Sequence, residues 1–163
     1  MTSLNTELLA IYLQDHLAGA TVSVELSRRV AGAHEGTPLG DVLEALTLEA
    51  INDRQALEDL MAVLEIQPDR IKTAAAWAGE KVGRLKFNGS LLQRSPLSDV
   101  VELEGMQMAV AWKAAGWRLL QSLATVDPRL GEADLDDLVR RADDQITRIE
   151  ELLASLVQER LTD

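Results

Sequence analysis

The sequence has no cysteine, only two histidines and few aromatic residues, and each scarcity excludes a class of structure or site. Without cysteine the chain can form no disulfide, no thiolate metal site and no cysteine nucleophile. Aromatic residues make up 3% of the 163 residues while alanine and leucine dominate, which favours helix over strand. No apolar run reaches the length of a membrane span. The N-terminal stretch has no basic region, so we expect no signal peptide and a cytoplasmic location.

Positive charge is also scarce, since the formal net charge is −11. This balance argues against a nucleic-acid partner and against binding to an anionic membrane surface. Apolar residues make up 47% and charged residues 26% of the chain, as in ordinary globular proteins, so we expect one domain over residues 1–163. G-x-S-x-G, the P-loop and G-x-G-x-x-G are all missing, and no nucleophilic triad is evident.

Apolar residues recur at three- and four-residue spacing and predict four long helices, at about 5–30, 38–66, 96–124 and 132–160. Thr37 and Ser95 are N-caps followed by proline, which is the expected start of the second and third long helices. A shorter helix is predicted over about 68–86. Short connections on either side of one long connection predict an all-α bundle with a single crossover that contains this extra helix.

Four polar residues interrupt the predicted inward faces near the middle of the long helices: His16, Asp53, Glu104 and Gln145. In the third long helix the predicted inward face consists of Leu97, Val101, Glu104, Met108, Ala111, Ala115 and Leu119. Burying polar groups costs free energy unless they find partners, so four of them at similar depth suggest one shared interior site.

This interior site has two interpretations. A reduced metal site would use His16, Glu49 or Asp53, and Glu104, an oxygen-rich set with one imidazole that suits iron, manganese or zinc. A structural network would pair His16 with Asp53 or Glu104 and close through Gln145, with Arg141 as a candidate further member, fixing helix register without chemistry. In either case carboxylates beside His16 would raise its pKa.

The predicted crossover helix is basic in an otherwise acidic chain. Between residues 70 and 94 there are six basic residues and one acid, against ten basic and 26 acidic residues elsewhere. The first five of the six, Arg70, Lys72, Lys81, Arg84 and Lys86, make up the basic patch of the predicted crossover helix, and Arg94 follows it. The patch would suit an acidic partner or a small anion, or it packs on its own acidic bundle or on a second subunit.

With the helix order in hand, the chain resembles the ferritin-like superfamily, most closely its small bacterial members. The stretches that carry the resemblance are LQDHLAGATVSVELSRRVAG, GTPLGDVLEALTLEAINDRQAL, AAAWAGEKVGRLKFNGSLL and LSDVVELEGM. The resemblance implies a ferritin-like four-helix bundle, frequent dimerisation and often a carboxylate metal centre. The extra crossover helix is similar to that of the stress-associated branch.

The ferritin-like metal pattern places Glu-x-x-His on two helices and a single Glu on each of the other two. Here Glu49 is followed three residues later by Asn52, and Arg141 by Asp144, so both histidines are missing. Glu104 is the best single match to a ligand.

We therefore expect a non-enzymatic structural or interaction protein that forms a homodimer. A buried polar network would take the place of the di-iron centre, without a cofactor. The alternative is a metal-binding protein or metal-dependent oxidoreductase that holds iron or manganese. A third hypothesis is a small-ligand site in a bundle cavity near the tryptophans.

Overall fold

The computed structural model describes residues 4–87 and 97–161, and this part of the chain is helical with no β-strand. The helices are α1 (Thr6–Ala33), α2 (Pro38–Val63), α3 (Arg70–Phe87), α4 (Ser98–Leu123), the short 3₁₀ helix η1 (Pro128–Glu132) and α5 (Leu135–Leu161). The predicted all-α class is confirmed. None of the described helices is both long and apolar enough to cross a membrane.

Local hydrogen bonds explain where the helices begin. Thr37 Oγ1 accepts a hydrogen bond from Gly40 N at 3.0 Å, and Pro38 occupies the first turn of α2, as predicted. The predicted cap at Ser95 lies outside the described residues. The fourth long helix starts later than predicted because Asp134 Oδ1 accepts from Asp137 N at 3.0 Å and so caps α5.

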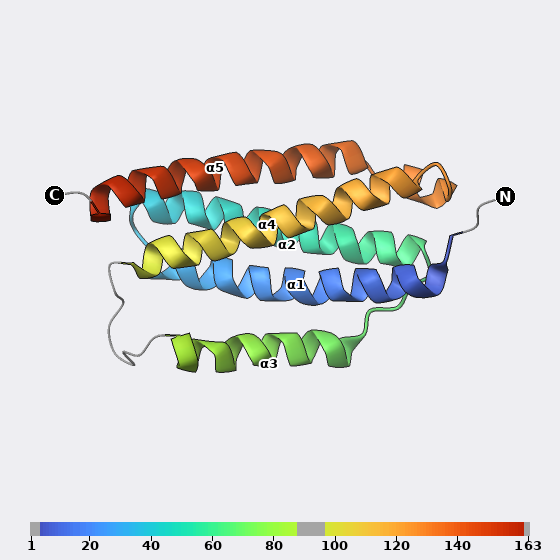
Figure 1. Cartoon of the computed structure of the whole chain (residues 1–163), viewed down its shortest axis with the longest axis horizontal. Helices are drawn as coiled ribbons and strands as arrows, with labels where there is room; N and C mark the ends of the chain where they lie inside the picture. Colours follow the sequence, from blue (N-terminus) through green and yellow to red (C-terminus); the bar gives the residue numbers. More distant parts are fainter. Residues whose placement is uncertain (1–3, 88–96, 162–163) are drawn as a thin grey trace.

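The four long helices run side by side, and α3 lies along the outer side of α1, away from α5 (Figure 1). Following the colours along the chain, α1 and α2 run in opposite directions, as do α4 and α5. α2 and α4 run in the same direction, so the chain must return along the bundle between them. α3 makes this return, in the position where the sequence predicts a crossover helix.

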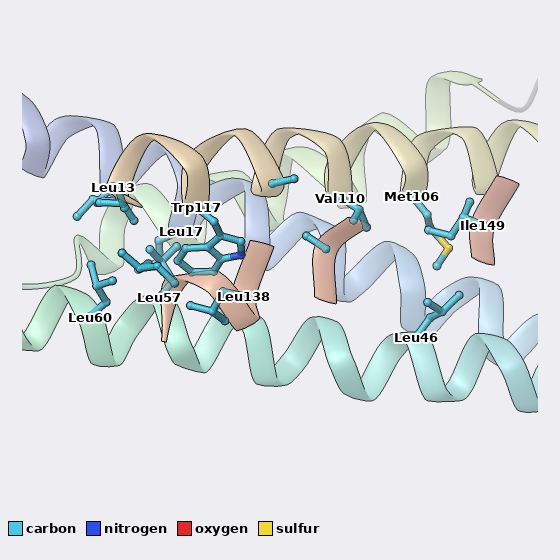
Figure 2. Close-up of a cluster of buried hydrophobic side chains, with 14 of the residues drawn as sticks. Leu13, Leu17, Leu46, Leu57, Leu60, Met106, Val110, Trp117, Leu138 and Ile149 are labelled. Carbon is cyan, nitrogen blue, oxygen red and sulfur yellow. The ribbon is translucent and has the colours of Figure 1, made fainter. Parts of the chain in front are cut away.

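The core lies between the four long helices and consists mainly of leucine (Figure 2). Leu13 and Leu17 of α1, Leu57 of α2 and Leu138 of α5 surround Trp117 of α4. All five side chains are buried, and burying a large apolar side chain contributes about 1.5–3 kcal/mol each relative to leaving it in water.

The predicted inward face of α4 is wrong. Of that face, Val101 is 62% and Met108 72% exposed, and Glu104, Ala111 and Ala115 are also exposed. The face that packs into the core is instead made by Val100, Leu103, Met106, Val110, Ala114, Trp117 and Leu120. α4 therefore carries two apolar stripes, and only one of them faces the core.

The apolar residues Ile71, Ala75 and Ala78, which share one face of α3, point away from the bundle. Ile71 is 84% exposed, and Ala75 and Ala78 are exposed as well. α3 is held to α1 by a polar contact, the ion pair between Lys72 Nζ and Asp15 Oδ1 at 2.7 Å.

Candidate functional site

A buried carboxylate, Asp53 in the middle of α2, is the centre of the interior polar site. Asp53 is 2% exposed. Its Oδ2 accepts hydrogen bonds from Lys113 Nζ at 2.5 Å and from Gln145 Nε2 at 3.0 Å, while Oδ1 accepts one from Arg141. Three helices thus meet at this one carboxylate, because α4 supplies Lys113 and α5 supplies both other donors.

Glu49 lies one helical turn before Asp53 and extends the site along α2. Its Oε2 accepts a hydrogen bond from Arg148 Nη2 at 2.5 Å and another from Gln145 Nε2 at 2.9 Å. Gln145 uses its other amide atom as well, since Oε1 accepts from Lys113 Nζ at 2.5 Å. We define the charge cluster by its six members: Glu49, Asp53, Lys113, Arg141, Gln145 and Arg148.

Asp53 and Lys113 stabilise each other's charged forms. Burial alone would raise the pKa of Asp53, but the Lys113 ammonium and the hydrogen bonds from Lys113, Gln145 and Arg141 outweigh it and hold this pKa below its usual value. Burial lowers the pKa of Lys113, and the Asp53 carboxylate is the main group that opposes this shift. Lys113 therefore depends on Asp53 to remain an ammonium inside the bundle.

His16 is buried, as predicted, but it does not join the charge cluster. Its ring lies 4.3 Å from the ring of Trp112, nearly parallel to it, and 4.5 Å from the ring of Tyr12 (centroid distances). The buried Nε2 has no hydrogen-bond partner among the described residues. Burial lowers the pKa of His16, and Asp15 only partly opposes this. The predicted pairing with a buried carboxylate and the predicted rise in pKa are therefore both wrong.

Glu104 is exposed on the outer side of α4, so its predicted interior position is wrong. No hydrogen bond or ion pair joins it to another described residue. The physical reason is the rotation of α4, which turns Val100, Leu103 and Lys113 inward and Glu104 outward. Of the five predicted interior residues the structure brings together Glu49, Asp53 and Gln145.

Lys113 and Arg148 are the members that sequence reasoning missed. Lys113 follows a tryptophan in an apolar stretch, and a lysine there is normally assigned to solvent, yet its side chain is only 17% exposed. A usable signal existed on α5. Arg141, Gln145 and Arg148 follow one another at four- and three-residue spacing, which places two cations and an amide on one helix face opposite Glu49 and Asp53.

The donor chemistry of the cluster does not fit a carboxylate metal centre. No group of three or more histidine, aspartate or glutamate side chains within 4–87 and 97–161 is arranged to hold a metal ion. The Lys113 ammonium lies where Asp53 and Gln145 oxygens converge, while Arg141 donates to Asp53 Oδ1 and Arg148 to Glu49 Oε2. A second cation at this point would meet three positive side chains.

A cavity beside the cluster is lined by residues of α1, α2 and α4, including His16, Asp53, Lys113 and both Trp112 and Trp117. The volume within which the centre of a water molecule fits is about 30 Å³. This is room for about two waters and too little for an organic ligand. His16 Nε2, Arg54 Nε and Trp117 Nε1 belong to lining residues and are buried without a partner among the described residues. Water in this cavity would satisfy such donors.

The basic patch is described only in part. Arg70 is exposed, and Lys72 forms the ion pair with Asp15 of α1, as expected if the crossover helix packs on its own acidic bundle. The side chains of Lys81, Arg84 and Lys86 lie outside the described residues.

Compared with protein-family models, curated proteins and solved structures, the chain matches none of them.

Replacing Asp53 by asparagine is expected to lower the free energy of unfolding by about 3–5 kcal/mol, because Lys113 and Arg141 lose the charge that compensates them. Urea titration of the purified variant measures this change. The control is Asp143→Asn, which removes an ion pair to Arg118 whose two side chains are each 49% exposed and should cost less than about 1 kcal/mol. Equal losses in the two variants would contradict the central position of Asp53.

Gly116→Ala is expected to lower the free energy of unfolding by about 1–3 kcal/mol through overpacking. A Cβ added at Gly116 would lie 2.8 Å from His16 Cε1, and the rings of Tyr12 and Trp112 limit how far His16 can move. Thermal or urea unfolding checks this result. Gly32→Ala is the matched control, since nothing lies within 4 Å of its added Cβ and the change should stabilise α1 by about 0.5–1 kcal/mol.

The lowered pKa of His16 makes stability depend on pH. In the unfolded chain the histidine pKa is 6.5, so the unfolded chain binds the proton more readily than the folded chain. The contribution of neutral His16 to the free energy of unfolding is therefore complete above pH 6.5 and is lost as the pH falls toward the lower pKa of the folded chain. Urea unfolding at intervals between about pH 7 and pH 5 should show this loss. In His16→Gln the loss over the same interval should be smaller; an unchanged slope would contradict the assignment.

Proposed function

We propose that this chain is a non-enzymatic ferritin-like helical scaffold in which the charge cluster stands in place of a di-metal centre. The observation that carries the proposal is the position of Lys113 Nζ, 2.5 Å from both Asp53 Oδ2 and Gln145 Oε1. An ammonium tethered to α4 thus supplies the positive charge that buried carboxylates require. Cross-linking of helices is a task that such a cluster performs without a bound ion.

The arrangement of the helices supports the ferritin-like part of the proposal. α2 and α4 run in the same direction and α3 makes the long connection between them, which is the single-crossover pattern of ferritin-like bundles. The cluster draws on α2, α4 and α5 near their middles, the level at which such bundles hold their ligands. We further propose that the protein is cytoplasmic and that it works by binding other proteins through its surface.

Metal binding is the measurement that tests the scaffold proposal. The protein is purified without chelator, incubated with Fe(II) or Mn(II), desalted and analysed for metal content. We expect much less than one metal ion per chain and no shift of the melting temperature on adding metal, because Lys113, Arg141 and Arg148 already pair with the carboxylates of Asp53 and Glu49. One tightly bound ion per chain that is lost in Asp53→Asn would overturn the proposal.

A further inference from the structure

The outer side of α4 carries an apolar stripe that is largely exposed. Two of its members border α1: the Trp112 ring packs on Gly19 and His16, and Gly105 lies beside Leu26. Val101, Met108, Trp112 and Leu119 are 62%, 72%, 45% and 37% exposed. Together with two small residues they form the α4 outer stripe, defined as Val101, Gly105, Met108, Trp112, Ala115 and Leu119. The described part of α3, the helix nearest in the chain, packs along α1 instead.

The spacing of the stripe is that of a helix–helix seam. Its members alternate four and three residues apart, so apolar or small side chains repeat every 3.5 residues from Val101 to Leu119. This heptad repeat is the pattern by which one helix packs against another along its length. The core-facing stripe of α4 is a separate set, and contacts with α1 account only for Gly105 and Trp112. The bundle therefore does not explain the exposed members Val101, Met108, Ala115 and Leu119.

The stripe is complementary to itself when a second α4 runs antiparallel. With a two-fold axis at the level of Val110, Met108 of one copy faces Trp112 of the other, Gly105 faces Ala115, and Val101 faces Leu119. The small residues next to the central layers leave room for the indole ring. Trp112 is available for this contact because its ring rests on Gly19 and His16 of α1 and is still 45% exposed.

The charges beside the stripe also favour antiparallel packing of two α4 helices. Glu104 and Arg118 flank the stripe on one side and are centred on Ala111, one residue from the level of the axis. The two-fold axis would therefore place Glu104 of each copy beside Arg118 of the other, whereas parallel helices would place Glu104 beside Glu104. Glu104 has no partner among the described residues, and Arg118 uses only Nη2 for its bonds to Asp143, at 2.5 and 2.7 Å.

We infer that the α4 outer stripe is the interface of a two-fold homodimer in which the two α4 helices pack antiparallel. A C2 interface uses the same patch on both subunits, and the order of layers and charges in this stripe meets that condition. The inference names the partner of the scaffold and does not depend on whether the charge cluster binds metal. Flanking charges of this kind fix orientation and partner choice more than affinity.

The first test is the dissociation constant of the dimer, measured by sedimentation velocity over a range of concentrations. Met108→Glu should raise this constant about 100-fold or more, because it places a carboxylate in the apolar seam. Leu48→Glu is the control, since Leu48 on α2 is 58% exposed and lies outside the stripe, and it should leave the constant unchanged. Circular dichroism verifies that both variants are folded.

The second test exchanges charges. Glu104→Arg and Arg118→Glu should each weaken the dimer about tenfold, since each places like charges together across the axis. Mixing the two variants should restore dimers, because each substituted side chain then meets an opposite charge on the other variant. This rescue is specific to the antiparallel pairing.

Three results would overturn the inference. The wild-type protein is monomeric at all concentrations, as expected if another segment of the same chain or a different protein covers the stripe. The wild-type dimer is unaffected by Met108→Glu, which means that it uses another face. The mixed charge variants fail to associate more strongly than each alone. None of these results changes the metal content that tests the scaffold proposal.

Discussion

The pairing of Asp53 with Lys113 and Arg141 is the interaction around which the middle of the bundle is arranged. A carboxylate that is 2% exposed is stable only because α4 and α5 bring positive charge to it and Gln145 adds an amide hydrogen bond. Leucine cores tolerate small shifts of one helix along another, whereas hydrogen bonds at 2.5–3.0 Å do not. The cluster therefore sets the register of α2, α4 and α5 at one level.

α1 is positioned by a different kind of contact, because no hydrogen bond joins it to the charge cluster among the described residues. The His16 ring packs against Gly116, and the Trp112 ring packs over Gly19, where an added Cβ would collide with the indole. Each glycine thus makes room for a ring from the neighbouring helix. α4 is held by charge toward α2 and α5, and toward α1 by ring packing and by the ion pair between Arg29 Nε and Glu102 Oε1 at 3.3 Å, so it presents its outer side as a fixed surface.

The helices could be predicted from the sequence because periodicity and caps such as Thr37 are local properties. Asp53 and Gln145 could be placed inside because each interrupts an otherwise apolar stripe. α4 could not be oriented in this way, since it has two apolar stripes and only the packing of the other helices decides which one is buried. One error of rotation therefore put Glu104 inside and Lys113 outside. The ring contacts of His16 depend on Gly116, a residue distant in sequence, and so had no local signal.

The two stripes of α4 also explain why the metal-ligand interpretation and the interface interpretation compete for the same residue. Glu104 was the best single match to the ferritin-like ligand pattern, and it also interrupts the apolar repeat that was predicted to face inward. On an inward face such an interruption indicates a polar interior site. On an outward face a charge beside a heptad seam has a different role, because it forms ion pairs that determine which helix packs there and in which direction. Under the proposed function, Lys113 supplies the interior cation as part of the chain. The bundle then needs no ligand at its centre, and the residue that suggested one is available to specify a second copy at its surface.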